Sequence, residues 1–140
     1  MAPRVLIADK LSPAALDIFK SRGVAADVKT GLSKAELLEI IGQYDGLAVR
    51  SATKADADVI AAASNMKVIG RAGIGVDNVD IPAATKSGIV VMNTPFGNAI
   101  TTAEHAIALI FALARQLPEA DQSTQAGKWE KNRLDRKSVV

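Results

Sequence analysis

The chain has 140 residues, of which 49% are hydrophobic and 23% are charged, and its formal net charge is +2 at pH 7. This length fits one domain, and the absence of cysteine excludes disulfides, a cysteine nucleophile and a cysteine metal site. The sequence shows neither a leader segment nor an apolar run long enough to cross a membrane. We therefore expect a cytoplasmic protein that has no membrane partner.

The positive charge is concentrated near the end of the sequence. Residues 128–137 contain five lysines and arginines against two acidic residues, which leaves a net charge of −1 for the rest of the chain. A nucleic-acid site normally places its basic residues along a folded face. We interpret this segment as a solvated tail and expect no nucleic-acid partner.

Short apolar runs at residues 4–9, 26–29, 46–50, 66–70 and 89–93 predict five strands separated by helical patterns. The runs are nearly continuous in apolar residues, which is typical of parallel strands buried on both faces. Because crossover connections are right-handed, this pattern favours an α/β fold. The predicted architecture is a flavodoxin-like, open and mainly parallel sheet of about five strands, flanked by helices.

Helix signals fall between these strands. Ser12 precedes a proline and predicts an N-cap for a helix that ends at Gly23. Ser33 and Glu36 form the pattern of a capping box. Asp80 predicts the cap of a further helix that ends near residue 88.

Residues 101–117 predict a long C-terminal apolar helix, opened by a capping box from Thr101 to Glu104. Its apolar residues occur almost all round, so we expect the helix to be buried on several sides. Residues 119–140 are mostly polar and would not cover it. The helix would then be covered by a partner subunit or by a part of the protein that is missing.

Polar and cationic residues follow the third and fourth predicted strands. Arg50 and Ser51 come after one strand, and Arg71 with Gly73 comes after the next. The carboxyl ends of parallel strands meet at one edge of a sheet, where ligands bind. An arginine fork beside backbone N–H groups suits a carboxylate or a phosphate. The sequence therefore predicts an anion site at this edge.

Two other interpretations of these residues fail. The glycine-rich turn is not a dinucleotide fingerprint, because Asn78 occupies the third glycine position and no acidic residue follows about twenty residues later. His105 is the only histidine and adjoins Glu104, so the two do not face each other along a helix. We expect a structural or partly buried histidine and no metal site.

Five blocks carry a family resemblance. In this order they are similar to the D-3-phosphoglycerate dehydrogenases, members of the D-isomer-specific 2-hydroxyacid dehydrogenase family: Val49–Lys54, Gly70–Asp80, Val91–Asn98, Ala103–His105 and Gly127–Glu130. The resemblance covers about residues 4–131, the N-terminal portion of such a protein. It implies NAD-linked oxidation of a small anionic 2-hydroxy acid, 3-phosphoglycerate, to 3-phosphohydroxypyruvate, the first step of serine biosynthesis.

The resemblance also implies roles for the strand-end residues. Arg50 and Ser51 would hold the anionic end of the substrate, whereas Arg71 and the region of Gly73 would line the cleft. The helix over 101–117 would form part of a homo-oligomer contact.

By the same resemblance, Ile74 and Thr102 would touch the edge of the NAD cofactor. Residues 1–97 would be the outer, substrate-binding domain, and residues 98–127 would be the first helices of a nucleotide-binding domain that is otherwise missing. Residues 128–140 are a polar tail that departs from the family pattern.

The sequence after residue 131 lacks the cofactor loop and the catalytic Arg, Glu and His of the family. We therefore expect no catalytic residue in this chain, weak or absent NAD binding, and an inactive product of truncation, frameshift or fragment expression. The alternative is a non-catalytic α/β interaction module or dimerising fragment. A phospho-receiver domain, which the sheet and the early Asp9 suggest, is disfavoured, because Arg50 and Ser51 stand where its phosphorylatable aspartate would be needed.

Overall fold

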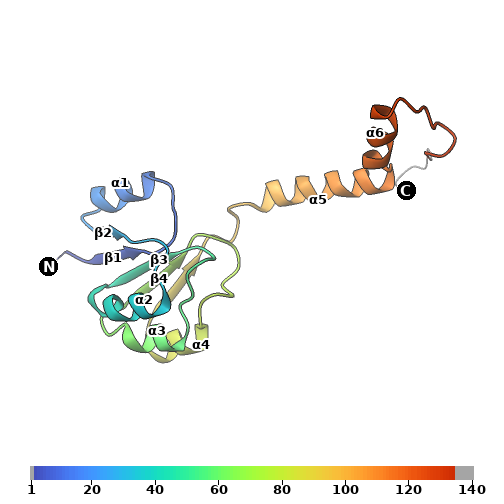
Figure 1. Ribbon diagram of the computed structural model, residues 1–140. Helices are drawn as coiled ribbons and strands as arrows, with labels where there is room; N and C mark the ends of the chain where they lie inside the picture. The colour runs from blue at the N-terminus through green and yellow to red at the C-terminus, as the bar shows by residue number, and fades with distance from the viewer. Residues whose placement is uncertain (1, 135–140) are drawn as a thin grey trace. The chain divides into compact units, whose positions relative to one another are not determined.

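The computed structural model describes residues 2–134. The chain divides into two compact units, the first ending at Gly97 and the second beginning at Asn98 (Figure 1). Each unit is described separately below. The functional roles expected for segments 1–97, 98–127 and 128–140 stay predictions, and residues 135–140 of the expected tail lie outside the described residues.

A five-stranded parallel sheet forms the centre of the first unit. Its strand order is β2-β1-β3-β4-β5, which is the flavodoxin-like order. This confirms the predicted parallel sheet, although each strand is only four residues long. The bounds are β1 Arg4–Ile7, β2 Ala25–Val28, β3 Gly46–Val49, β4 Val68–Arg71 and β5 Val90–Asn93.

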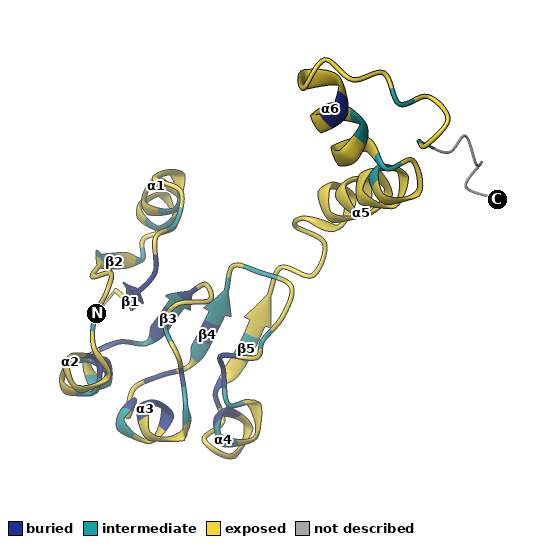
Figure 2. Cartoon of the chain, turned by 45° about the vertical axis from the view of Figure 1, so that its right-hand side comes forward, coloured by how far each residue is buried: buried dark blue, intermediate teal, exposed yellow. Residues whose placement is uncertain are grey.

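Four short helices cover the two faces of the sheet unequally. Helices α2, α3 and α4 lie on one side, and α1 lies alone on the other (Figures 1 and 2). Right-handed crossovers require this arrangement, because the chain moves in one direction from β1 to β2 and in the other from β2 onward. The helices are α1 Ala14–Ser21, α2 Lys34–Ile40 followed by the 3₁₀ turn η1 Ile41–Gln43, α3 Ala57–Ala62 and α4 Ile81–Lys86.

Of the three helix caps predicted in this unit, two are confirmed and one is wrong. Ser33 and Glu36 form the predicted capping box of α2. Asp56 and Asp80 cap α3 and α4 by accepting hydrogen bonds from backbone N–H groups three residues later. The prediction for Ser12 is wrong, because α1 begins one residue later than expected and a proline without a capping side chain occupies its N-cap.

The hydrophobic core lies between the sheet and helices α2–α4. Leu6, Leu47 and Ile69 point into it from adjacent strands and are almost completely buried. On β5, Val91 packs against the same core. Because side chains alternate along a strand, Val90 and Met92 point to the opposite face, where they are 58% and 59% exposed.

The second unit contains two helices, α5 Ala99–Ala114 and α6 Leu117–Gln125, which contact each other. The helix predicted over 101–117 therefore begins earlier and ends earlier than expected. It stops because Gln116 adopts a left-handed conformation with φ of 49°. The predicted capping box is also wrong, since Asn98 occupies the N-cap and makes no side-chain cap hydrogen bond.

Within the described chain, no residue of α5 is buried (Figure 2). The expectation that this helix is buried on several sides is therefore not met by the contacts of this chain. Over the described residues, 2–134, the helices are too short or too polar to cross a membrane.

Candidate functional site

Three neighbouring strands bring polar residues to one edge of the sheet. Strand β3 pairs with β1 on one side and with β4 on the other, all in parallel, so their carboxyl ends coincide. Asp9 follows β1, the Arg50–Thr53 turn follows β3, and Arg71 ends β4, opposite Val49 in the register. The chain order reverses between β1 and β3, and such a switch point is where open α/β sheets bind ligands.

The Asp9 carboxylate accepts hydrogen bonds from both ends of the Arg50–Thr53 turn. Its Oδ2 accepts a hydrogen bond of 2.6 Å from the Arg50 backbone N–H. Its Oδ1 accepts one of 2.7 Å from the Thr53 hydroxyl, and the Thr53 backbone N–H lies 3.1–3.2 Å from both oxygens. Asp9 is only 6% exposed. The carboxylate therefore fixes both ends of the turn.

Opposing effects act on the pKa of Asp9. Burial by itself would raise it, but hydrogen bonds from the Thr53 hydroxyl and from backbone N–H groups of the turn outweigh burial and lower the pKa below its usual value of 3.8. The group is therefore ionised at neutral pH. Its donors are already in place for the charged form.

The side-chain amide of Asn78 holds the same turn from the other side. Its Nδ2 donates to the carbonyl oxygens of Arg50 and Thr53, at 2.7 and 2.6 Å. Its Oδ1 accepts a hydrogen bond of 2.6 Å from Nε of Arg71. Because Nε of arginine can only donate, this contact fixes which amide atom is oxygen. Asn78 is 8% exposed, and its amide is fully used.

Arg71 lies across the glycine-rich turn. Its side chain is 10% exposed, and one terminal nitrogen lies 3.5 Å from Oδ1 of the exposed Asp77. A Cβ at Gly73 would overlap the guanidinium, and one at Gly75 would come within 2.8 Å of Asp77 Oδ1. These glycines make room for side chains of the turn itself, whereas the sequence suggested room for a ligand.

Arg50 and Ser51 are exposed at the tip of the turn. The backbone of Arg50 is held at its N–H by Asp9 and at its carbonyl by Asn78. Among residues 2–134, no ion pair or hydrogen bond engages its guanidinium. The structure thus places a free cation on a rigid backbone, beside a second cation that is oriented by Asn78.

The two residues predicted to touch the cofactor lie in different units. Ile74 is exposed in the glycine-rich turn, where its carbonyl accepts a hydrogen bond from Asn93 Nδ2 at 2.7 Å. Thr102 is exposed in the first turns of α5. Their contact with a cofactor stays a prediction.

His105 is exposed on α5, so the prediction of a partly buried histidine is wrong. Its position in the middle of α5 explains this, because this chain supplies no cover for that helix. Within residues 2–134, no cluster of three or more acidic or histidine side chains could hold a metal ion.

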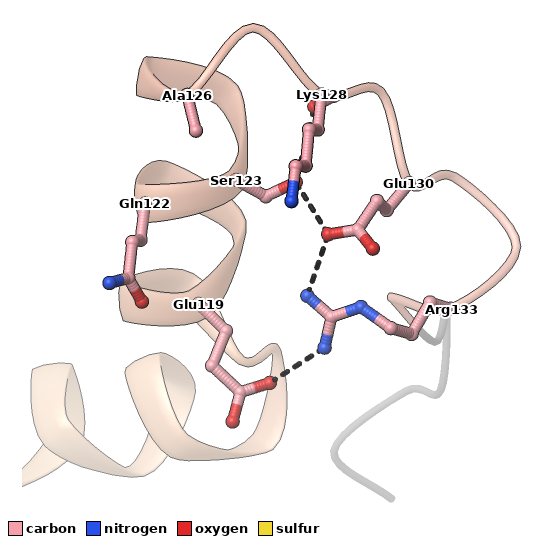
Figure 3. Close-up of a pocket in the computed structure, with 7 residues that line it drawn as sticks. All are labelled: Glu119, Gln122, Ser123, Ala126, Lys128, Glu130 and Arg133. Atoms are coloured by element: carbon pink, nitrogen blue, oxygen red, sulfur yellow. Dashed lines mark hydrogen bonds and ion pairs between the residues drawn. The ribbon is translucent and has the colours of Figure 1, made fainter.

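A polar pocket of about 420 Å³ lies in the second unit, between α6 and the segment that follows it (Figure 3). The buried Ser123 hydroxyl donates to Glu130 at 2.7 Å, and Arg133 bridges Glu130 at 3.0 Å and Glu119 at 3.5 Å. Arg133, and then Ser123, lower the pKa of Glu130. These groups are paired with one another, and their contacts hold the segment that follows α6 against that helix.

Sequence reasoning missed the two side chains that organise the edge. Asp9 stood out only as a feature of receiver domains, and Asn78 only as a mismatch to a nucleotide motif. The available signal for Asp9 was a carboxylate that directly follows the apolar run of residues 5–8. For the contacts of Asn78 with the turn no local signal exists, because Thr53 and Arg50 lie 25 and 28 residues earlier.

We predict that Asp9→Asn lowers the free energy of unfolding at pH 7 by about 1–3 kcal/mol, because buried donors of the turn lose a charged acceptor. The folded-state pKa is depressed, so this stabilisation is present above the ordinary pKa of 3.8 and disappears as the pH falls through the folded value. Urea unfolding between pH 3 and 7 measures it. Asp17→Asn, which removes an exposed carboxylate from α1, is the control; an equal loss in both variants would contradict the prediction.

Comparison with known proteins identifies the relatives of this chain. Residues 5–130 match the family model of the D-isomer specific 2-hydroxyacid dehydrogenase catalytic domain. The D-3-phosphoglycerate dehydrogenase of Archaeoglobus fulgidus is 54% identical over 131 residues, and that of Homo sapiens is 50% identical over the same length. Each alignment covers 94% of this chain but 25% of the relative, so the chain spans about a quarter of the length of these proteins.

Solved structures show the same fold. A crystal structure of a protein from Pyrococcus horikoshii matches with a TM-score of 0.83 and 33% identity, over 94% of this chain and 39% of that one. The NAD⁺-bound 3-phosphoglycerate dehydrogenase of Entamoeba histolytica matches with a TM-score of 0.72 and 32% identity, over 82% and 40%. The sequence match, the sheet order and the polar strand ends together show that this chain belongs to the D-isomer-specific 2-hydroxyacid dehydrogenase family.

Proposed function

We propose that this chain is the substrate-binding part of an NAD-dependent oxidoreductase that converts 3-phosphoglycerate to 3-phosphohydroxypyruvate in the cytoplasm, as the first step of serine biosynthesis. The choice of substrate is supported by the relatives, which are named D-3-phosphoglycerate dehydrogenases and are about half identical to this chain. Because the chain matches only a quarter of their length, the activity of the whole protein is part of the proposal.

One observation carries the proposal. Arg50 and Arg71 emerge at the ends of two paired strands, and each is held by buried hydrogen bonds of its backbone or side chain. A phosphorylated 2-hydroxy acid carries two anionic groups, a carboxylate and a phosphate. Guanidinium groups bind both by paired N–H donors, and rigid placement reduces the entropy lost on binding. In this proposal Arg50 and Ser51 hold one anionic end, and Arg71 with Gly73 lines the cleft.

The described residues do not fit the pyrophosphate of NAD. That group needs glycine N–H donors at the start of a helix, but no helix begins at Gly75, and the Arg71 side chain lies over the turn. The exposed Ile74 and Thr102 offer contact with the cofactor's edge alone. We therefore assign no catalytic step to this chain, whose role is to bind and orient the acid.

A second candidate function, a dimerising α/β module, is favoured by the surface of α5. Ile107 and Ile110 are each 53% exposed, and the other exposed large apolar side chains of this helix are between 50% and 77% exposed. Covering such a surface with a second copy would remove apolar area from water at about 25 cal/mol per Å². We propose that α5 pairs two copies of the chain, which is compatible with the substrate-binding role.

The anion site predicts that Arg50→Ala and Arg71→Lys each raise the Kd for 3-phosphoglycerate at least about tenfold, the loss of one charge-assisted pair. Arg71→Lys keeps the charge but removes the fork and the Nε donor to Asn78. Isothermal titration calorimetry measures the affinity. Arg22→Ala, an exposed arginine at the end of α1, is the control and keeps the wild-type Kd. Normal affinity in both site variants would refute the site.

The isolated 140-residue chain is predicted to show no NADH oxidation with 3-phosphohydroxypyruvate above background. Reduction requires a bound nicotinamide and a group that protonates the new hydroxyl, and we assign neither to this chain. The assay follows absorbance at 340 nm at high protein concentration. Turnover that scales with protein and is lost in Arg50→Ala would show that the chain contains catalytic groups.

The proposed pairing predicts that replacing Ile107 and Ile110 together by Glu converts an oligomer into a monomer, because the interface would bury unpaired charges. Sedimentation or light scattering measures the mass. Replacing Thr124 and Gln125, exposed residues of α6, by Glu is the matched control. An unchanged mass in the α5 variant would exclude α5 as the contact.

A further inference from the structure

We propose that Asn78 is a positioning residue that sets the Arg50–Thr53 turn and Arg71 in one fixed relation, so that together they bind a ligand with two anionic groups. This inference rests on the proposed function, because it concerns how the anion site holds its two cationic groups at the separation of the two charges of a phosphorylated 2-hydroxy acid. Asn78 itself does not touch the ligand in this proposal.

Asp9 and Asn78 bind different backbone groups of the Arg50–Thr53 turn. Asp9 accepts the N–H groups of Arg50 and Thr53, whereas Asn78 donates to the carbonyls of the same two residues. Asp9 therefore anchors the turn to β1. Asn78 anchors it to the chain that follows β4. Removing Asn78 leaves one anchor in place and frees the side of the turn that faces Arg71.

The side-chain amide of Asn78 also contacts Arg71. Its Oδ1 accepts the Nε–H at 2.6 Å, and a terminal nitrogen of the guanidinium rests against Gly73. Because the guanidinium is planar, one short hydrogen bond and one backbone contact restrict the direction of its remaining N–H donors. Asn78 thus holds the backbone that carries the Arg50 arm of the site and orients the guanidinium of the Arg71 arm.

Only a primary amide supplies two donors and an acceptor at one position, and the amide of glutamine lies one methylene further from the backbone than that of Asn78. An aspartate at position 78 would keep the acceptor for Arg71 but lose both donors to the turn. An alanine would lose all three hydrogen bonds and leave buried carbonyls without partners. Asn78→Asp therefore affects only the contacts with the turn, whereas Asn78→Ala affects the contacts with both the turn and Arg71. The two replacements thus test each contact by itself.

Binding is tested with two probes, D-3-phosphoglycerate and inorganic phosphate. A ligand that spans both arms depends on their relation, whereas a single anion needs only one of them. We expect Asn78→Ala to raise the Kd for D-3-phosphoglycerate at least about tenfold and that for phosphate less than about threefold. Asn65→Ala, which removes one hydrogen bond from an asparagine amide to the Gly42 carbonyl far from this edge, is the matched control. Equal losses for both probes, or no loss for either, would overturn the proposal.

Positioning is tested separately by ¹H–¹⁵N NMR of the free chain. Asn78→Ala is expected to speed water exchange of the Arg71 ε N–H at least about tenfold and to shift the Ser51 and Lys54 amides, whose peptide carbonyls lose their donor. Asn78→Asp is expected to shift those two amides while the Arg71 ε N–H stays protected. Asn65→Ala changes none of these signals. An Arg71 signal that Asn78→Ala leaves unchanged would overturn the proposal.

The two experiments distinguish failure of the proposed function from failure of this inference. If the wild-type chain binds neither probe, the anion site is refuted, and the NMR experiment alone decides whether Asn78 fixes the two arms. If the wild-type chain binds and the NMR signals respond as expected, but the Kd values of Asn78→Ala equal the wild-type values, the anion site stands and Asn78 is not its positioning residue. Should Asn78→Ala fail to fold, Asn78→Asp tests the turn alone: the Ser51 and Lys54 amides are expected to shift while the Arg71 ε N–H stays protected, and unshifted amides would overturn the proposal.

Discussion

The turn after β3 is held between a buried carboxylate and a buried amide, and the rest of the candidate site depends on this clamp. Asp9 supplies the acceptors and Asn78 supplies the donors, so every backbone group that they bind is satisfied without water. A turn anchored only by its own residues would be mobile at a sheet edge. Here the exposed side chain of Arg50 extends from a backbone that is anchored at its N–H by Asp9 and at its carbonyl by Asn78.

The parallel sheet is what makes such a clamp possible. Its two halves come from residues 9 and 78, far apart in sequence, yet the order β1-β3-β4 places them on either side of one turn. The nearly continuous apolar residues of β1 and β3 favour this order, and on one face Leu6 and Leu47 are buried in the core that helices α2 and α3 share. Stability of the core and geometry of the site are therefore carried by the same three strands.

The sequence predicted the elements better than it predicted their ends and their polar contacts. The five strands and the caps at Ser33 and Asp80 follow from local patterns, because apolar runs and capping residues act over a few positions. The left-handed Gln116 that ends α5 does not, since no glycine marks it. Arg50 and Arg71 were identified by their place after strands, whereas the role of Asn78 depends on partners that only the fold brings near.

Because helices cover one face of the sheet only in part, the local stability of the sheet differs between β1 and β5. On the face of α1, Val5 and Ile7 of β1 are buried, but Val90 and Met92 of β5 are open to water. The sheet is therefore a three-layer sandwich at β1 and a two-layer one at β5. Backbone hydrogen bonds in thinly covered strands open more often than those in a buried centre. Arg71 ends β4, which pairs with the thinly covered β5. Transient opening of the hydrogen bonds of β5 would therefore affect the position of Arg71, while the hydrogen bonds of Asp9 remain intact.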